Sequence, residues 1–273
     1  KSTVILMHAE AAVVEQVVAA LGFAAGVFPQ TYLGLPLSWE KLLFADFLPM
    51  IAKVDEYLAG WAARLLSPAG RLVLINAVLD ALPTYAMAAM LLPPAVIKEL
   101  DSLRRAFLWN AAERASGAQC LVAWERVCRT KAEGGLGVRD LATQNRCLLL
   151  KMPHRLHATS SSSRWALWVW AELDGRSLLS PAASRSAGEH GKALARLLPL
   201  YRGITRVTVR DGRRTSFWLD SWLPCGPLAV ALPVLHSHTT VKEATVWRVR
   251  ARGLDSVLVP RLTSTGAVER ATL

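Results

Sequence analysis

The sequence predicts a mainly α-helical protein, with a helical bundle, a helical connector and a small C-terminal β-hairpin module. Apolar residues recur three or four positions apart across residues 38–109 and 120–173, which is the spacing of a buried helix face. Residues 204–219 instead alternate apolar and polar side chains around Asp211-Gly212, as strands joined by a tight turn do. Because 52% of the 273 residues are hydrophobic, the chain can bury a sizeable core and is not a disordered tail.

The N-terminal part begins with a short helix followed by extended chain. Residues 9–21 are amphipathic and stop at Gly22, after which the chain is expected to run extended to Pro29. A second helix starts at or bends at Pro49 and continues to Leu66, since its apolar residues keep helical spacing.

Helices are next predicted within residues 67–109. Ser67 is an N-cap and Pro68 the first helical residue, where its missing N–H is not needed. Pro83 interrupts this helix, and Pro93-Pro94 opens a later one. The side chains expected to face inward are Leu72, Ile75, Leu79 and Leu82, then Val96, Leu100, Leu103 and Phe107. Those expected to face water or a ligand are Lys98, Asp101, Arg104 and Arg105.

The apolar segment 72–97 raises a membrane-associated alternative. It has 26 residues and a single charge, Asp80, and could cross a bilayer core of about 30 Å. Its prolines break the helix, however, and Asp80 near the bilayer centre would cost roughly 2.5–3.5 kcal/mol. A buried pair of helices is therefore preferred, and no membrane partner is expected.

A glycine-rich turn precedes the next predicted helix, at about residues 141–157. The glycines of residues 134–137 match neither the P-loop nor the dinucleotide-binding pattern, so no nucleotide or other small-molecule substrate is expected. The turn is expected to deliver Asp140 as an N-cap. Pro153 should kink or end this helix, because a proline inside an unbroken helix costs about 3 kcal/mol.

A run of serines at residues 160–163 is the predicted domain boundary. Trp165, Trp168 and Trp170 follow on a helix, where either base stacking or core packing could use them.

The predicted hairpin has a three-residue loop, residues 210–212, with Gly212 in the left-handed conformation. This register places Val207, Val209, Thr215 and Phe217 on one face. The other face then carries Arg206, Thr208, Arg214 and Ser216, a small basic surface suited to phosphate contact.

Charge is distributed unevenly along the chain, whose net charge is +11. Residues 1–100 carry six Lys and Arg against eight Asp and Glu, whereas residues 101–273 carry 26 against 13. The basic part is where a polyanion would be met. The excess of arginine over lysine suits bidentate phosphate contact, but biased codon usage would produce the same excess, so both explanations stay open.

Neither a metal site nor secretion is predicted. The four cysteines form no C-x2-C pair and no disulfide framework, which fits free thiols in a reducing compartment. His154 and His157 have a possible ligand spacing but no third ligand near them in sequence. No signal peptide opens the chain, so an intracellular place in the nucleus or cytoplasm is expected, and Lys1 in place of Met suggests a fragment.

Several ordered motifs resemble the segment after the palm in reverse transcriptases of plant non-LTR (LINE-type) retrotransposons. The resemblance covers roughly residues 1–235 and rests on the order and spacing of the motifs rather than on any one of them. The motifs are Tyr32-Leu-Gly-Leu-Pro-Leu37, Gly70-Arg-Leu72, Ala81-Leu-Pro-Thr-Tyr85, Leu92-Pro93, Arg105-Ala-Phe-Leu-Trp109, Val122-Ala-Trp124, Gly134-Gly-Leu-Gly-Val-Arg-Asp-Leu141, Asn145 and Phe217-Trp-Leu-Asp-Ser-Trp222.

The resemblance implies roles for two short segments. Tyr32-Leu-Gly34 is similar to a primer-grip hairpin, in which Gly34 permits a tight turn and close approach to a primer end; an ordinary buried turn is the alternative. Phe44-Ala-Asp-Phe47 lacks the second carboxylate of the polymerase metal box, so Asp46 is interpreted as a surface residue of a helix. No catalytic residue is assigned, no cofactor is expected in this chain, and Mg²⁺ is expected only for the missing palm.

The resemblance also implies a division of the chain and a function. The divisions are the end of a palm with a primer-grip-like hairpin (1–37), a thumb-like helical bundle (38–117), a helical connector (118–160), a Trp-rich helix with the β-hairpin module (161–235) and a divergent tail without zinc (236–273). The implied function is that of a fragment of an RNA-directed DNA polymerase, inactive alone, which binds an RNA/DNA template–primer without sequence preference. An inert, translated relic is the alternative. The residues expected to bind nucleic acid are Tyr32, Gly34, Arg64, Arg71, Arg105, Lys131, Arg206 and Arg214.

Overall fold

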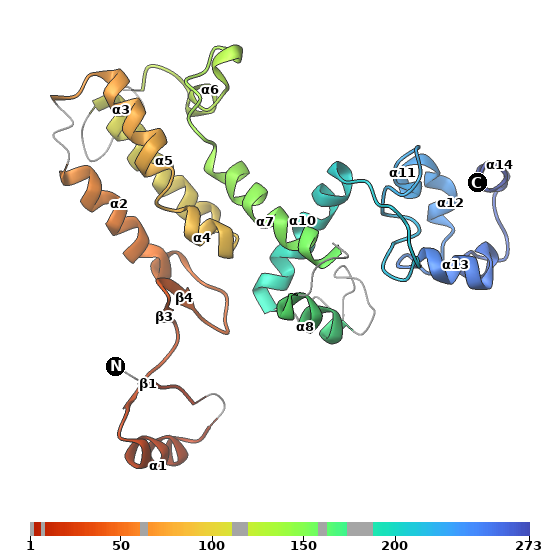
Figure 1. The fold of residues 1–273 in the computed structure, drawn as a ribbon, viewed down its shortest axis with the longest axis horizontal. Helices are drawn as coiled ribbons and strands as arrows, with labels where there is room; N and C mark the ends of the chain where they lie inside the picture. The colour runs from red at the N-terminus through yellow and green to blue at the C-terminus, as the bar shows by residue number, and fades with distance from the viewer. Residues whose placement is uncertain (1–2, 7–8, 61–64, 111–119, 158–162, 174–187) are drawn as a thin grey trace. The chain divides into compact units, whose positions relative to one another are not determined.

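The computed structural model describes residues 3–6, 9–60, 65–110, 120–157, 163–173 and 188–273. Within these ranges the chain is mainly helical, which confirms the predicted fold class, and it forms two compact units, Lys1–Arg146 and Cys147–Leu273 (Figure 1). Residues 160–162 of the predicted linker lie outside the described residues. Each unit is considered by itself below.

The first unit opens with two short sheets. β1 (Thr3–Val4) pairs in parallel with β2 (Ala24–Ala25), and α1 (Ala11–Leu21) lies between them in sequence. α1 ends at Gly22, whose φ of 68° is left-handed, as the sequence predicts. β3 (Gln30–Tyr32) then pairs with β4 (Leu35–Leu37) as an antiparallel hairpin.

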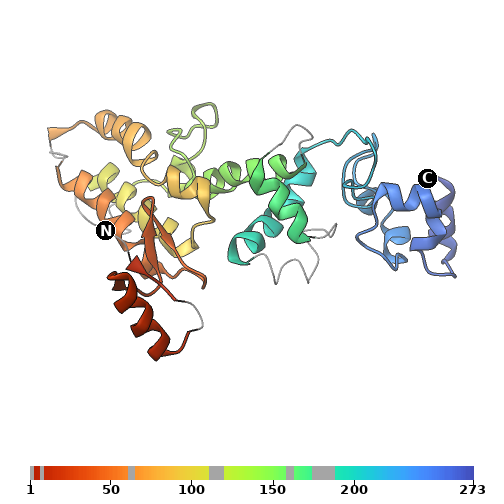
Figure 2. The same ribbon diagram turned by 60° about the horizontal axis from the view of Figure 1, so that its bottom comes forward.

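Helices make up the rest of this unit. They are η1 (Phe44–Phe47), α2 (Leu48–Gly60), α3 (Pro68–Leu74), the π turn η3 (Ile75–Leu79), α4 (Thr84–Ala89) and α5 (Pro94–Asn110), followed by α6 (Trp124–Val127), η5 (Lys131–Glu133) and the start of α7 (Leu141–His157). α5 packs against η1, α2, α3 and η3 (Figures 1 and 2). The predicted N-cap is confirmed, since the N–H of Gly70 donates to Ser67 Oγ at 3.2 Å.

Burial follows most of the predicted apolar stripes. Val96, Leu100, Leu103 and Phe107 of α5 are buried, as are Ile75 and Leu79, while Leu72 and Leu82 are half-buried. Segment 72–97 is divided among α3, η3, α4 and the start of α5. In the part of the chain that the structure describes, no helix is both long and apolar enough to cross a membrane.

Asn145 of α7 holds the junction between α4 and α5. Its Oδ1 accepts the N–H of Leu92 at 2.8 Å, and its Nδ2 donates to the carbonyls of Met87 and Met90 at 2.7 and 2.9 Å. The side chain is fully buried. These bonds satisfy backbone groups that the end of α4 leaves without helical partners, so Asn145 fixes where the chain turns into α5.

The glycine-rich turn leads into α7 as predicted. Gly134 and Gly137 have φ values of 79° and 72°, which a glycine adopts at little cost. Asp140 caps α7, because its carboxylate accepts the N–H of Ala142 and the hydroxyl of Thr143.

α7 runs to His157, so the helix predicted at about residues 141–157 is confirmed and Pro153 does not end it. A proline removes one backbone donor from the helix. Here the ring and the neighbouring Leu156 are buried, and that packing offsets the lost hydrogen bond.

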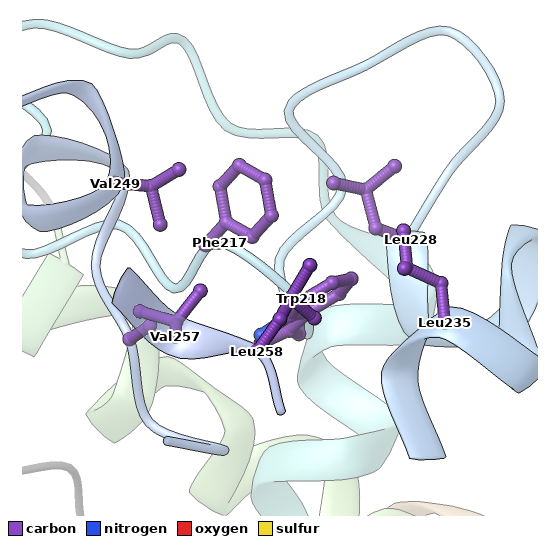
Figure 3. Close-up of a cluster of buried hydrophobic side chains, with 8 residues drawn as sticks. Phe217, Trp218, Leu228, Leu235, Val249, Val257 and Leu258 are labelled. Atoms are coloured by element: carbon purple, nitrogen blue, oxygen red, sulfur yellow. The ribbon is translucent and has the colours of Figure 1, made fainter. Parts of the chain in front are cut away.

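The second unit contains the end of α7 and a series of further helices. They are α8 (Arg164–Leu173), α10 (Gly188–Ile204), α11 (Leu228–Ala231), α12 (Pro233–Ser237), α13 (Val246–Arg252), η6 (Leu254–Val257) and α14 (Ser264–Ala271). Trp218 is fully buried and packs in a cluster with Phe217, Leu228, Leu235, Ala244, Val249, Val257 and Leu258 (Figure 3). The divergent tail therefore supplies part of this core. A separate cluster joins Leu156, Ala166, Leu198 and Tyr201.

The predicted β-hairpin around residues 204–219 is not formed as a pair of strands, so that prediction is wrong. None of these residues belongs to a strand, and Ser216 makes an isolated bridge with Thr245 instead. The N–H of Phe217 likewise donates to the carbonyl of Ala244 at 2.8 Å. Within the segment the N–H of Val207 donates to the carbonyl of Ser221 at 2.9 Å, but Ser216 and Phe217 take backbone partners near residue 245, which a local alternation of side chains cannot reveal.

Two features of the predicted hairpin do hold. Gly212 has a φ of 70°, the left-handed conformation expected for the loop. The expected faces also exist: Thr215 and Phe217 are buried and Val207 and Val209 half-buried. On the other face Arg206, Thr208 and Arg214 are exposed and Ser216 is half-buried.

Candidate nucleic-acid interface

The hairpin β3–β4 presents an exposed tip. Leu33 and Gly34 form its two-residue loop with φ values of 50° and 80°, the pair of positive angles that matches the twist of the flanking strands. Tyr32 is 64% exposed and Leu33 71% exposed, so the alternative of a buried turn is wrong. A Cβ on Gly34 would meet nothing within 4 Å, which leaves the backbone open to close approach.

A leucine in the left-handed region is strained by roughly 1–2 kcal/mol. Strain kept at an exposed tip is often linked to function, because the surroundings in the free protein do not require that side chain. Leu33 is therefore the second apolar side chain that this tip would offer to a partner, beside Tyr32.

The variant Leu33→Asn is expected to raise the free energy of unfolding by about 1 kcal/mol, since asparagine accepts a positive φ more readily. Urea denaturation followed by circular dichroism would measure the change. Leu37→Asn is the matched control, because Leu37 is also an exposed leucine of this hairpin but has no positive φ, and no gain is expected there. A loss of stability in Leu33→Asn would show that the leucine packs on the protein.

A buried polar network lies in the bundle. The guanidinium of Arg104 donates from Nη1 to Asp101 Oδ1 at 2.6 Å and from Nη2 to the carbonyl of Arg139 at 2.7 Å. Its Nη2 also lies 2.7 Å from Asp80 Oδ1, and both of these side chains are at most 1% exposed. The prediction that Arg104 faces water or a ligand is therefore wrong. Asp101, predicted to face the same way, is half-buried.

Trp124 completes this network from α6. The guanidinium groups of Arg104 and Arg105 lie 5.3 and 5.6 Å from the centroid of its indole ring. Burial raises the pKa of Asp80 and of Asp101, an effect that the positive charge of Arg104 opposes in both cases. Burial also raises the pKa of Cys128 to about 11, so this thiol is a poor nucleophile near neutral pH.

One sequence signal could have revealed this network. Asp80 is the single charge in an apolar window, and a buried carboxylate needs a cation partner. Arg104 was missed because an arginine in an amphipathic helix is normally exposed.

The predicted binding residues of the first unit are not brought together in one site. Tyr32 and Gly34 lie in the hairpin, and Lys131 is exposed on η5. Arg71 is half-buried, and its Nη1 donates to the carbonyl of Leu108 at 3.4 Å. Arg105 is half-buried against Trp124, as given above. Arg64 lies outside the described residues.

Residues 217–222 organise the second unit. The carboxylate of Asp220 accepts from Arg202 Nε at 2.8 Å and from the N–H of Ser216 at 2.7 Å, with both charged side chains at most 10% exposed. The indole N–H of Trp222 donates to the carbonyl of Phe217 at 2.9 Å. This motif is therefore a structural element that fixes the chain on both sides of Trp218.

The predicted binding residues of the second unit lie on its surface. Arg206 and Arg214 are both exposed. The guanidinium of Arg214 lies 5.0 Å from the ring centroid of Trp170 on α8. Trp170 is half-buried, and its indole N–H donates to the carbonyl of Leu156. This tryptophan therefore packs against the protein while its ring also contacts Arg214. Across the described ranges, no group of three or more His, Cys, Asp or Glu side chains could hold a metal ion.

Comparison with known proteins finds two plant relatives. The chain is 34% identical over 200 residues to At1g65750 of Arabidopsis thaliana, a protein named for ribonuclease H, and the match takes in 71% of this chain and 32% of that protein. It is 33% identical over 154 residues to the uncharacterized mitochondrial protein AtMg00310 of the same plant, over 52% of this chain and 93% of that protein. The chain thus spans about a third of the length of the first relative. No protein-family model and no solved structure matches.

Proposed function

The chain belongs to the family of the plant mitochondrial protein AtMg00310, and from that premise we propose that it is the part of a retroelement reverse transcriptase that follows the palm and grips template and primer. The similarity to a protein named for ribonuclease H supports a role on nucleic acid, because a ribonuclease H acts on RNA paired with DNA. The proposal assigns to this chain the binding of an RNA/DNA hybrid and no chemical step.

The observation that carries the proposal is the tip of β3–β4. The motif order assigns a primer grip to Tyr32-Leu-Gly34, and at this place the structure has a tight hairpin with an exposed tyrosine, a strained exposed leucine and an open glycine. A flat ring and a bare backbone edge can press on the sugar and base at a primer end.

The mainly basic remainder of the chain would supply sequence-independent attraction to phosphates. Residues 101–273 carry twice as many basic as acidic side chains, 26 against 13. Binding of this kind weakens steeply with added salt, because the counterions that the protein displaces from the nucleic acid gain less entropy when the surrounding salt is more concentrated.

A titration of the whole chain against a fluorescent RNA/DNA hybrid at low and moderate salt tests the proposal. Binding at low salt that falls with added salt is expected, and Tyr32→Ala should raise Kd about tenfold, or about 1.4 kcal/mol. Tyr85→Ala is the matched control, since Tyr85 is a 57% exposed tyrosine on α4 of the same unit. No binding at low salt would instead favour an inert relic. Equal losses of affinity in Tyr32→Ala and Tyr85→Ala would show that the hairpin tip is not the primer-binding element.

A further inference from the structure

Residues 210–215 of the second unit run along the start of α13. The N–H of Trp247 donates to the carbonyl of Gly212, and that of Val246 donates to the carbonyl of Thr215, both at 3.0 Å. A Cβ added to Gly212 would lie 2.9 Å from the Trp247 nitrogen, so only glycine allows this approach. The backbone thus holds the two segments together, and their side chains share one surface.

α13 directs its apolar side chains inward and its aromatic ring outward. Val249 is buried in the core around Trp218, and Val246 packs against the same cluster. Trp247 is 44% exposed. Arg250 is exposed and lies three residues further along, so it falls on the same side of the helix as Trp247.

Arg213 is stacked on the exposed tryptophan. Its guanidinium lies 5.3 Å from the ring centroid of Trp247, within the range of a cation–π contact. Arg213 is itself exposed, so one side of its planar guanidinium group can be reached from solution. The next residue, Arg214, stacks in the same way on Trp170, as described above. Arg213 and Arg214 therefore each place a guanidinium over an indole ring.

The surface has a strong excess of positive charge. Arg206, Arg210, Arg213 and Arg214 in one segment and Arg250 and Arg252 on α13 are all exposed, and none takes part in the ion pairs found among the described residues. The acid nearest in sequence, Asp211, accepts the N–H of Arg213. Further along, Asp255 pairs with Arg270, and Glu243 is half-buried. The arginines are thus available to an external anion.

We propose that this Arg213–Trp247 surface is a second binding site that takes single-stranded nucleic acid. An unpaired base continues the stack on the guanidinium of Arg213, and the neighbouring arginines contact the phosphates on either side. A duplex hides its base faces within its own stack, so this surface distinguishes single strands from paired ones. This inference rests on the proposed role on nucleic acid. It differs from the grip at β3–β4 because it assigns single strands, and not the hybrid, to the second unit.

The experiment is a fluorescence anisotropy titration of the whole chain with labelled oligo(dT) and, separately, with an RNA/DNA hybrid duplex. Trp247→Ala and Arg213→Ala are expected to raise Kd for oligo(dT) about tenfold, the typical loss of one stacked base, while Kd for the hybrid changes less than about twofold. Arg213→Lys should lose most of the affinity too, because lysine keeps the charge but has no planar group to stack.

Two matched controls belong to the same unit. Trp168→Ala removes a tryptophan that is 60% exposed and has no arginine over its ring among the described contacts, and Arg196→Ala removes an exposed arginine of α10. Both should bind oligo(dT) like the unchanged chain. Circular dichroism identifies any variant that fails to fold, and the exposed Arg213 variants keep the test valid if Trp247→Ala does so.

The outcomes separate the two proposals. Wild-type affinity in Arg213→Lys, an equal loss in Trp168→Ala or no binding of oligo(dT) would each overturn the single-strand site. Binding of oligo(dT) that depends on Trp247, without binding of the hybrid, would instead uphold this site and overturn the grip proposed for β3–β4.

Discussion

Replacing Asp80 with alanine is expected to lower the free energy of unfolding of the first unit by about 3–5 kcal/mol, because the change leaves the guanidinium of Arg104 buried with one of its two carboxylates gone. Asp80 is fully buried and Arg104 is 1% exposed, so water cannot replace the lost partner. Hydrogen exchange of the amides of α5, read by mass spectrometry, would report the loss in this unit separately from the other.

Two further variants make this result specific. Asp55→Ala removes an exposed aspartate of α2 and should change stability by less than about 0.5 kcal/mol. The double variant Asp80→Leu with Arg104→Met should recover at least half of the loss, since an apolar pair of similar size avoids the buried charge. If the double variant were less stable than Asp80→Ala, the hydrogen bonds of Arg104 to Asp101 and Arg139 would be the larger contribution.

Replacing Trp218 with alanine is expected to destabilise the second unit by about 3–5 kcal/mol, the usual result of removing a buried aromatic ring and leaving a cavity. The ring is fully buried and packs edge-on against Phe217, with ring centroids 4.9 Å apart. It also lies 5.5 Å from the ring of His236, so its loss affects segments before and after α11.

Hydrogen exchange of residues 228–258 would measure this effect. Trp168→Ala serves as control, because its 60% exposed ring should contribute less than about 0.5 kcal/mol. Similar losses in both variants would show that the second unit is stabilised by surface packing and not by the cluster around Trp218.

The parts of the fold that the sequence predicted are those set by neighbours a few residues apart. The N-cap at Ser67, the stop at Gly22, the inward face of α5 and the cap at Asp140 all depend on local spacing and residue type. The mainly helical class follows from the same patterns.

The parts that it missed depend on partners distant in sequence. Arg104 of α5 meets Asp80 at the end of η3 and the carbonyl of Arg139 in the loop before α7 only once these segments have packed. Ser216 and Phe217 take backbone partners at residues 244 and 245 and not from a paired strand within the segment, so the predicted side-chain faces are correct and the predicted pairing is not. Among the candidate binding residues, the hairpin tip was found from a motif, whereas Arg213 and Trp247 belong to no motif and emerge only from their contact.

The core of the second unit also limits how its sequence can drift. Ala244, Val249, Val257 and Leu258 lie more than twenty residues after Phe217-Trp218, yet they enclose the ring of Trp218. Any copy that retains Phe217-Trp218 must keep four comparably placed aliphatic side chains downstream, although the polar positions between them can change freely. The volume of these downstream side chains therefore matters to the position of Trp218 although they lie outside its motif.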